Sequence, residues 1–251
     1  MSRKIVVYNG SPRGMQSNTN QVINHMLNKL PYDMNLEVSY IDALLYKIRL
    51  CRGCSQCFST GKCPLDKVDE MKKVKHLLLE SDLVILGTPV FAGNVSGQFK
   101  VMIDRLAYWL HLMCLCGKPI IIVTTSCGNG VFFTDLYLKT IVKFWGGRQI
   151  ASANYTIFER DDIYSKKADD LSTELATKIV EWFSYKKFED RTIINDLNKI
   201  FYTMQQNIKL YEQDPNFEYR YWNENGLLNL TNFEEVILKY KSITKYLMEV
   251  I

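Results

Sequence analysis

Four closely spaced cysteines are the most chemically informative feature of this sequence. Cys51, Cys54, Cys57 and Cys63 are separated by two, two and five residues, in a segment that reads as a long irregular loop. Such a loop suits an iron–sulfur cubane, in which each iron takes one thiolate. Zinc is the alternative metal, but a zinc ribbon usually separates two cysteine pairs by a longer stretch. The spacing therefore favours iron–sulfur chemistry, with these four thiols as ligands.

A second candidate site follows the first predicted strand, residues 4–8. The loop contains Ser11, Arg13, Ser17, Asn18 and Thr19, and a predicted helix begins near its end. Backbone amides at a helix N-terminus, aided by the helix dipole, form an anion site. The loop has neither the P-loop pattern nor Gly-x-Gly-x-x-Gly, which argues against a nucleotide triphosphatase and a dinucleotide fold. It predicts a phosphate site, and simple capping of the helix is the alternative.

Two more polar loops follow later predicted strands. Residues 87–97 read Gly-Thr-Pro-Val-Phe-Ala-Gly-Asn-Val-Ser-Gly, and residues 124–130 read Thr-Thr-Ser-Cys-Gly-Asn-Gly. Each alone could be a plain strand-to-helix turn. In a parallel sheet, however, loops at the carboxyl ends of strands meet at one crevice, where ligands bind. We therefore expect these loops and the phosphate loop to form one site.

Strand and helix patterns alternate along the first three quarters of the chain. Apolar or alternating runs predict strands at residues 4–8, 36–41, 82–87, 119–125 and 149–155. Predicted helices occupy residues 18–30, 66–80, 96–112, 130–145 and 162–183. This order indicates an α/β fold with a doubly wound, five-stranded parallel sheet covered on both faces. We expect a domain over residues 1–188 and a helical C-terminal extension over residues 189–251.

The loop motifs carry a resemblance to a known family. Gly10-Ser-Pro-Arg…Ser17-Asn-Thr19 and Gly87-Thr-Pro-Val-Phe…Asn94-Val-Ser96, followed by Lys100 and Asp104-Arg105, resemble the NADPH-dependent FMN reductases of the flavodoxin-like fold. The resemblance covers roughly residues 3–185. It implies that the FMN phosphate is held by Ser11, Arg13, Ser17, Asn18 and Thr19. It also implies that the flavin ring is flanked by Pro89, Val90, Phe91, Gly93 and Asn94, and closed on its other side by Thr125, Ser126 and Gly128.

The cysteine loop resembles two kinds of relative within that family. One is the iron–sulfur flavoprotein branch, whose compact motif carries a 4Fe–4S cluster close to FMN. The other is a set of FMN reductases with a similar cysteine-rich loop but no established cluster, in which the loop would be a structural cap. Because the loop follows the second predicted strand, we expect it to start at the same sheet edge as the flavin loops, with the cysteines and any cluster next to the FMN ring.

Composition sets the remaining expectations. A net charge of +4, spread along the chain, does not indicate a nucleic-acid partner, and no apolar run is long enough to span a bilayer. A cytoplasmic location is expected, because the N-terminal segment lacks a signal-peptide pattern. The extension is predicted as helices at residues 192–212 and 232–250, joined by an aromatic link at 217–222. It is expected to be a partner surface or lid in a homo-oligomer, or else to pack on its own domain.

Three functions fit these observations. The first is an enzyme in which NAD(P)H reduces bound FMN, which then reduces a small-molecule acceptor such as a quinone. The second is an electron carrier in which a cluster exchanges electrons between FMN and a ferredoxin-type partner. The third is a non-catalytic module on the same scaffold. In the first two the flavin carries the chemistry, so no Ser/His/Asp triad is expected.

Overall fold

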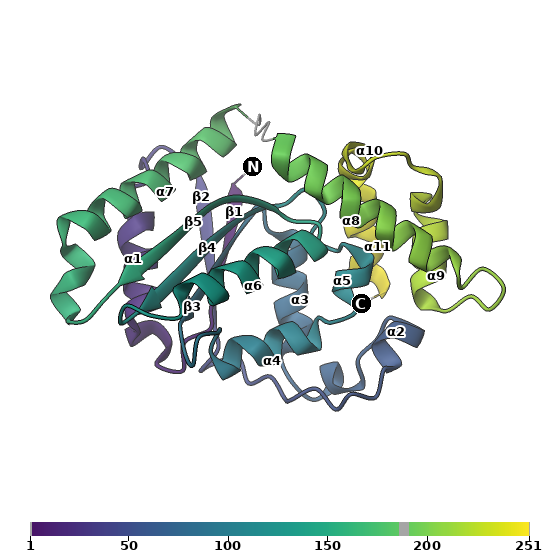
Figure 1. Ribbon diagram of the computed structural model, residues 1–251, viewed down its shortest axis with the longest axis horizontal. Helices are drawn as coiled ribbons and strands as arrows, with labels where there is room; N and C mark the ends of the chain where they lie inside the picture. Colours follow the sequence, from purple (N-terminus) through teal and green to yellow (C-terminus); the bar gives the residue numbers. More distant parts are fainter. Residues whose placement is uncertain (1, 186–190, 251) are drawn as a thin grey trace.

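A five-stranded parallel sheet lies at the centre of the computed structural model, which describes residues 2–185 and 191–250. The strand order is β2-β1-β3-β4-β5, which confirms the flavodoxin-like sheet expected from the sequence (Figure 1). The strands are β1 (Arg3–Asn9), β2 (Leu36–Asp42), β3 (Leu83–Pro89), β4 (Pro119–Ser126) and β5 (Arg148–Thr156). Parallel pairing places all five carboxyl ends at one edge.

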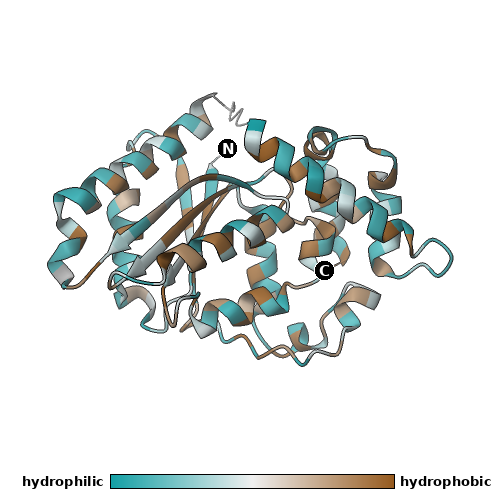
Figure 2. Cartoon of the chain, viewed as in Figure 1, coloured by the Kyte–Doolittle hydropathy of each residue, from teal (hydrophilic) through white to brown (hydrophobic). Residues whose placement is uncertain are grey.

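Alternating side chains of the central strands belong to two separate hydrophobic cores, one on each face of the sheet. In β1, Ile5 and Val7 belong to one core, and Val6 and Tyr8 belong to the other. Successive side chains of a strand point to opposite faces, so a strand covered on both sides must be apolar throughout. Figure 2 shows the result, with brown central strands and two-toned helices. The near-continuous apolar runs of the sequence therefore correspond to doubly covered strands.

Helices cover both faces of the sheet (Figure 1). One face is covered by α1 (Asn18–Leu27) and α7 (Lys166–Tyr185). The other face is covered by α3 (Met71–Glu80), α4 (Gly97–Arg105), α5 (Trp109–Leu112) and α6 (Val131–Phe144). Short 3₁₀ turns are η1 (Gly14–Gln16), η2 (Pro64–Lys67), η3 (Arg160–Tyr164) and η4 (Leu227–Asn229). In the described part of the chain, no helix combines the length and apolar character that crossing a bilayer requires.

The C-terminal extension packs against the face that carries α3 to α6. Its helices are α8 (Arg191–Lys209), α9 (Phe217–Glu224), α10 (Phe233–Leu238) and α11 (Tyr240–Val250). Phe201 of α8 stacks on the buried Trp222 of α9, with ring centroids 5.4 Å apart. Both rings belong to the same continuous core as α3 to α6. The extension therefore packs on its own domain, whereas the boundary predicted at 188/189 lies outside the described residues and stays a prediction.

Four stretches differ from their predicted structure. The short helix α2 (Gln56–Thr60) lies in the segment expected to be an irregular loop, and α9 replaces the expected aromatic link. The helix expected over residues 96–112 is broken into α4 and α5, because the chain turns at Leu106 and buries both Tyr108 and Trp109 completely. The helix expected over residues 232–250 is likewise broken at Lys239, which caps α10.

Candidate functional site

The loop between β1 and α1 is organised from inside by Asn9, the last residue of the strand. The fully buried Asn9 donates from Nδ2 to the carbonyl oxygen of Gly14 at 2.9 Å. Its Oδ1 accepts from the backbone amide of Ser11 at 3.2 Å. These two bonds hold the first and middle parts of the loop in one conformation. Asn9 directly follows the strand predicted over residues 4–8, but its support of the loop could not be predicted from the sequence, because both bonds depend on the conformation of the folded loop.

Ser17 and Thr19 begin helix α1 at the end of this loop. Ser17 is the N-cap residue, and its Oγ accepts from the amide of Asn20 at 3.1 Å. The capping that the sequence allowed as an alternative is therefore present. Of the amides in the first turn of α1, the Ser17 side chain bonds only that of Asn20. The amides of Asn18 and Thr19 also lie in this turn, where helix amides have no intrahelical partner. Such a helix start attracts an anion.

The three predicted loops meet at one cavity of about 170 Å³. Thr19 Oγ1 of α1 lies 2.7 Å from Thr125 Oγ1 of β4, so two of the loops are directly hydrogen-bonded. The lining residues are Ser11, Arg13, Ser17, Asn18, Thr19, Pro89, Val90, Phe91, Thr125, Ser126, Cys127 and Ile157. Cys127 and Ile157 were not predicted from the sequence. Ile157 directly follows β5, so the carboxyl end of a fourth strand also reaches the cavity.

The loop after β3 is tied to the phosphate loop. Ser96 caps α4 by accepting from the amide of Phe99 at 3.1 Å, and its hydroxyl donates to the carbonyl oxygen of Gly10. Gly10 has no room for a side chain, because a Cβ there would lie 2.5 Å from the Phe99 ring. The loop after β3 and the phosphate loop therefore lie close together, and the Ser96 hydroxyl joins them.

Three predicted flavin residues do not line the cavity. Gly93 lies at the tip of a tight turn in which Phe91 and Asn94 exchange backbone hydrogen bonds of 2.9 and 3.0 Å. The Asn94 side chain is turned back, and its Oδ1 accepts from the amide of Val95 at 2.8 Å. Gly128 instead lies beside the exposed ring of Phe158. These residues shape the loops around the cavity without contributing to its wall.

The four cysteines of the loop line a second cavity, of about 270 Å³. Cys51 and Cys54 are exposed, whereas Cys57 and Cys63 are half-buried. Burial raises the pKa of the Cys57 thiol to about 11, and the nearby Cys63 and Cys51 thiols add to the shift. Within the described residues, no three Cys, His, Asp or Glu side chains are gathered closely enough to hold a metal ion. Four free thiols are the donor set that a thiolate-bound metal requires, but the loop must draw them closer together to bind one.

A buried guanidinium fastens both ends of the cysteine loop. Arg105, the last residue of α4, donates to the carbonyl oxygen of Arg49 at 3.0 Å, just before the first cysteine. It also forms ion pairs with Asp66, at 2.6 Å, and Asp69, just after the last cysteine. Asp66 has a second partner in Lys75, which is completely buried and lies at 2.5 Å. Arg105 lines the cysteine cavity, so its positive charge also lies beside the thiols.

The two cavities are separate, and helix α4 runs between them. No described residue belongs to the linings of both. The N-terminus of α4 is capped by Ser96 in the loop after β3, and its C-terminal Asp104 and Arg105 line the cysteine cavity. At 1.5 Å per residue, this nine-residue helix is about 13 Å long. The cysteine loop therefore starts at the expected sheet edge but forms a site of its own.

Sequence comparison relates the chain to flavoproteins. The profile of a family described as NADPH-dependent FMN reductase matches residues 3–161. An iron-sulfur flavoprotein of Archaeoglobus fulgidus is 31% identical over 228 residues, which cover 87% of this chain and 97% of that protein. An iron-sulfur flavoprotein of Clostridioides difficile is 27% identical over 184 residues, covering 73% and 80% of the two chains.

Solved structures show the same fold. An FMN-dependent NADH-azoreductase from Bacillus anthracis, in complex with FMN, gives a TM-score of 0.54 at 12% identity, covering 70% of this chain and 99% of that chain. An NADH:FMN oxidoreductase gives a TM-score of 0.52 at 18% identity, covering 76% and 94%. At these identities the likeness is one of fold alone.

Proposed function

Because the chain belongs to the NADPH-dependent FMN reductase family, we propose that it binds FMN and uses it to carry electrons from NAD(P)H to a small acceptor or a redox partner. The observation that carries this proposal is the meeting of the loops after β1, β3 and β4 at one cavity. Ten of the thirteen residues predicted from the sequence line that cavity. The cavity thus combines the N-terminus of α1, which can bind a phosphate, with the apolar side chains after β3, which can pack against a flavin ring.

The chain's own residues bind and orient the cofactor. The Ser17 and Thr19 side chains and the first amides of α1 hold the phosphate, with the exposed Arg13 adding positive charge. Pro89 and Val90 contribute the wall beside the flavin ring. FMN, when bound, supplies the two-electron chemistry, so the protein needs no acid–base residue of its own for hydride uptake.

The open side of the cavity offers a stacking surface for a second planar ligand. Phe91 lines the cavity and remains 48% exposed. We assign this face both to the nicotinamide of the donor and to the acceptor. One shared face means that donor and acceptor take turns.

Purified protein is expected to bind one FMN per chain, and NADH or NADPH should bleach its flavin absorbance directly in single-turnover mixing. A shared face predicts ping-pong kinetics, seen as parallel double-reciprocal plots when donor and acceptor are varied. A titration with FMN followed by these rate measurements checks both points. Intersecting plots would show a ternary complex and exclude the shared face, and a chain that takes up no FMN would remove the proposal altogether.

A second candidate function is electron transfer through an iron–sulfur cluster. It is supported by the four cysteines that line one cavity and by the 31% identity to an iron-sulfur flavoprotein. Cys51, Cys54, Cys57 and Cys63 would hold a 4Fe–4S cluster, which supplies one-electron chemistry when bound. A ferredoxin-type protein is the partner that suits an iron–sulfur electron carrier. A small oxidant such as a quinone is the acceptor that suits an FMN oxidoreductase driven by NAD(P)H.

Anaerobically purified protein is expected to be brown, with about four irons and four sulfides per chain. Cys54→Ala should lose the iron and keep FMN, because Cys54 lines only the cysteine cavity. Cys116→Ala is the matched control, since Cys116 is buried elsewhere and should retain both. Iron and sulfide assays with an absorption spectrum measure the outcome. Zinc without sulfide would indicate a zinc site, and a yellow, metal-free protein would leave the loop as a structural cap.

A further inference from the structure

Helix α9 of the C-terminal extension lies directly behind the cysteine loop. Gly61 ends the short helix α2 between the third and fourth cysteines, with a φ of 75°. A Cβ at this position would lie 2.5 Å from Cζ of Phe217, the first residue of α9. Gly61 and Phe217 are both buried. The loop backbone and the Phe217 ring are therefore packed without room for one more carbon atom.

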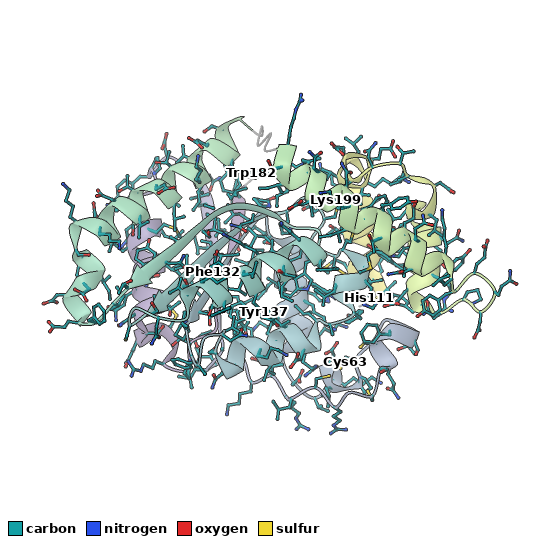
Figure 3. All side chains as sticks on the ribbon, in the orientation of Figure 1. Cys63, His111, Phe132, Tyr137, Trp182 and Lys199 are labelled. Atoms are coloured by element: carbon teal, nitrogen blue, oxygen red, sulfur yellow. The ribbon has the colours of Figure 1, made fainter. Side chains whose placement is uncertain are left out.

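A second contact joins the same two segments through α5. Phe58 of α2 packs against His111, with ring centroids 5.2 Å apart. His111 Nδ1 lies 2.7 Å from Oε1 of Glu218 in α9, a carboxylate that is almost fully buried. Figure 3 labels His111 and Cys63 on the side of the molecule where Figure 1 labels α2 and α9. The loop is thus connected to the extension twice, directly at Phe217 and indirectly through His111 of α5.

Helix α9 is itself firmly fixed. Trp222 and Tyr221 are completely buried in the core shared with the sheet helices. Trp222 Nε1 also donates to the carbonyl oxygen of His111 at 2.9 Å. Cys57 and Phe58 pack against this same core. The cysteine loop is therefore held between two buried supports, Arg105 at its ends and α9 at its middle.

We infer that the C-terminal extension is a positioning element for the cysteine ligands, with Phe217 as the residue that sets where the segment from Cys57 to Cys63 lies. The family match ends at residue 161, so it assigns the extension no role. Two of the four thiols flank the contact with Phe217, and the loop must draw its thiols together to bind a metal. A fixed wall limits the positions that these two thiols can reach. The inference deepens the proposed cysteine site and rests on it only for iron binding.

Gly61→Ala tests the contact without removing any ligand. The added methyl collides with Phe217 and should push the loop away from α9. In the metal-free protein, alkylation of Cys57 and Cys63 by iodoacetamide, followed by mass spectrometry, should become roughly tenfold faster, because overpacking makes local opening easier. Cys51 and Cys54 are already exposed and serve as internal references. FMN content should not change.

Two further variants separate the contact from backbone strain. Gly53→Ala, in the same loop, carries the same kind of strain at φ 64°, but its Cβ meets nothing within 4 Å. It should leave the alkylation rates of Cys57 and Cys63 near those of the wild type. Adding Phe217→Leu to Gly61→Ala makes room for the methyl and should restore slow alkylation. Equal rates in the two alanine variants, or no rescue by Phe217→Leu, would overturn the inference.

Anaerobic reconstitution with iron and sulfide gives a second readout. Gly61→Ala should retain less iron or show an altered electron paramagnetic resonance spectrum, and Phe217→Leu should reverse the change. If the wild type binds no iron, the proposed cluster fails while the alkylation result still decides whether α9 positions the loop. If iron binding is normal in Gly61→Ala although the loop is opened, the positioning role is wrong and the cluster stands.

Discussion

Replacing Arg105 with methionine is expected to lower the free energy of unfolding at pH 7 by about 3–5 kcal/mol, because one partner of a buried ionic network is removed. The Arg105 side chain is completely buried, and that of Asp69 is 2% exposed. Asp66 would keep Lys75 as its partner, but Asp69 would lose its only ion pair among the described residues. Urea denaturation of the metal-free protein measures the change.

The size of this effect should depend on pH. Burial alone would raise the pKa of Asp69, but hydrogen bonds from Arg105 and from the amides of Arg49 and Met71 hold it below its usual value. In the wild type, Asp69 therefore adds stability above its unfolded pKa of about 3.9, and this is lost as the pH falls through the lower folded value. Without Arg105, the pKa of Asp69 is higher than in the wild type, because only the two amide hydrogen bonds then oppose the effect of burial, so protonation relieves the buried charge at a higher pH. The difference between variant and wild type should shrink as the pH approaches 4.

Lys100→Met is the matched control on the same helix. Lys100 also pairs with a carboxylate, Asp104, but both side chains are more than 40% exposed. Exposed pairs of this kind contribute about 0–1 kcal/mol. If Arg105→Met costs no more than Lys100→Met, or if its cost is the same at pH 4 and pH 7, the guanidinium does not stabilise the loop ends through charge.

The flavin cavity could be predicted from sequence because its signals are local. Each strand is followed at once by the loop that contributes to the site, and parallel topology brings the loops together. Gly93 and Asn94 were expected from the family resemblance but do not line the cavity, because the turn after Phe91 folds back on itself. Turn geometry at this scale depends on a few dihedral angles, which the sequence pattern does not specify.

Features that depend on distant partners could not be predicted. Arg105 belongs to a recognisable motif, but its carboxylate partners lie 36 and 39 residues away in the chain. Helix α9 gave a signal that was missed. Asn216 is a good N-cap residue, and the i, i+4 spacing of Phe217 and Tyr221 is helical. That its first ring would meet Gly61 follows only from tertiary packing.

Placing glutamate at both Ser17 and Thr19 is expected to weaken FMN binding by at least about a hundredfold, equivalent to roughly 2.7 kcal/mol. Both side chains line the cavity and are almost fully buried, so two carboxylates would face the phosphate at the start of α1. Like charges in a buried site repel strongly, and the helix amides would be drawn to the new carboxylates instead. Fluorescence titration with FMN measures the loss.

Riboflavin distinguishes loss of the phosphate site from general damage, since it has the same ring but no phosphate. The variant should bind riboflavin nearly as well as the wild type does, so that the wild-type preference for FMN disappears. Gln16→Glu adds one negative charge, half that of the double variant, to the exposed part of the same loop, outside the cavity lining, and should change FMN affinity only slightly. Unchanged FMN affinity in the double variant would place the phosphate elsewhere. An equal loss of both flavins would mean that Ser17 and Thr19 support the fold of the cavity and not the recognition of the phosphate.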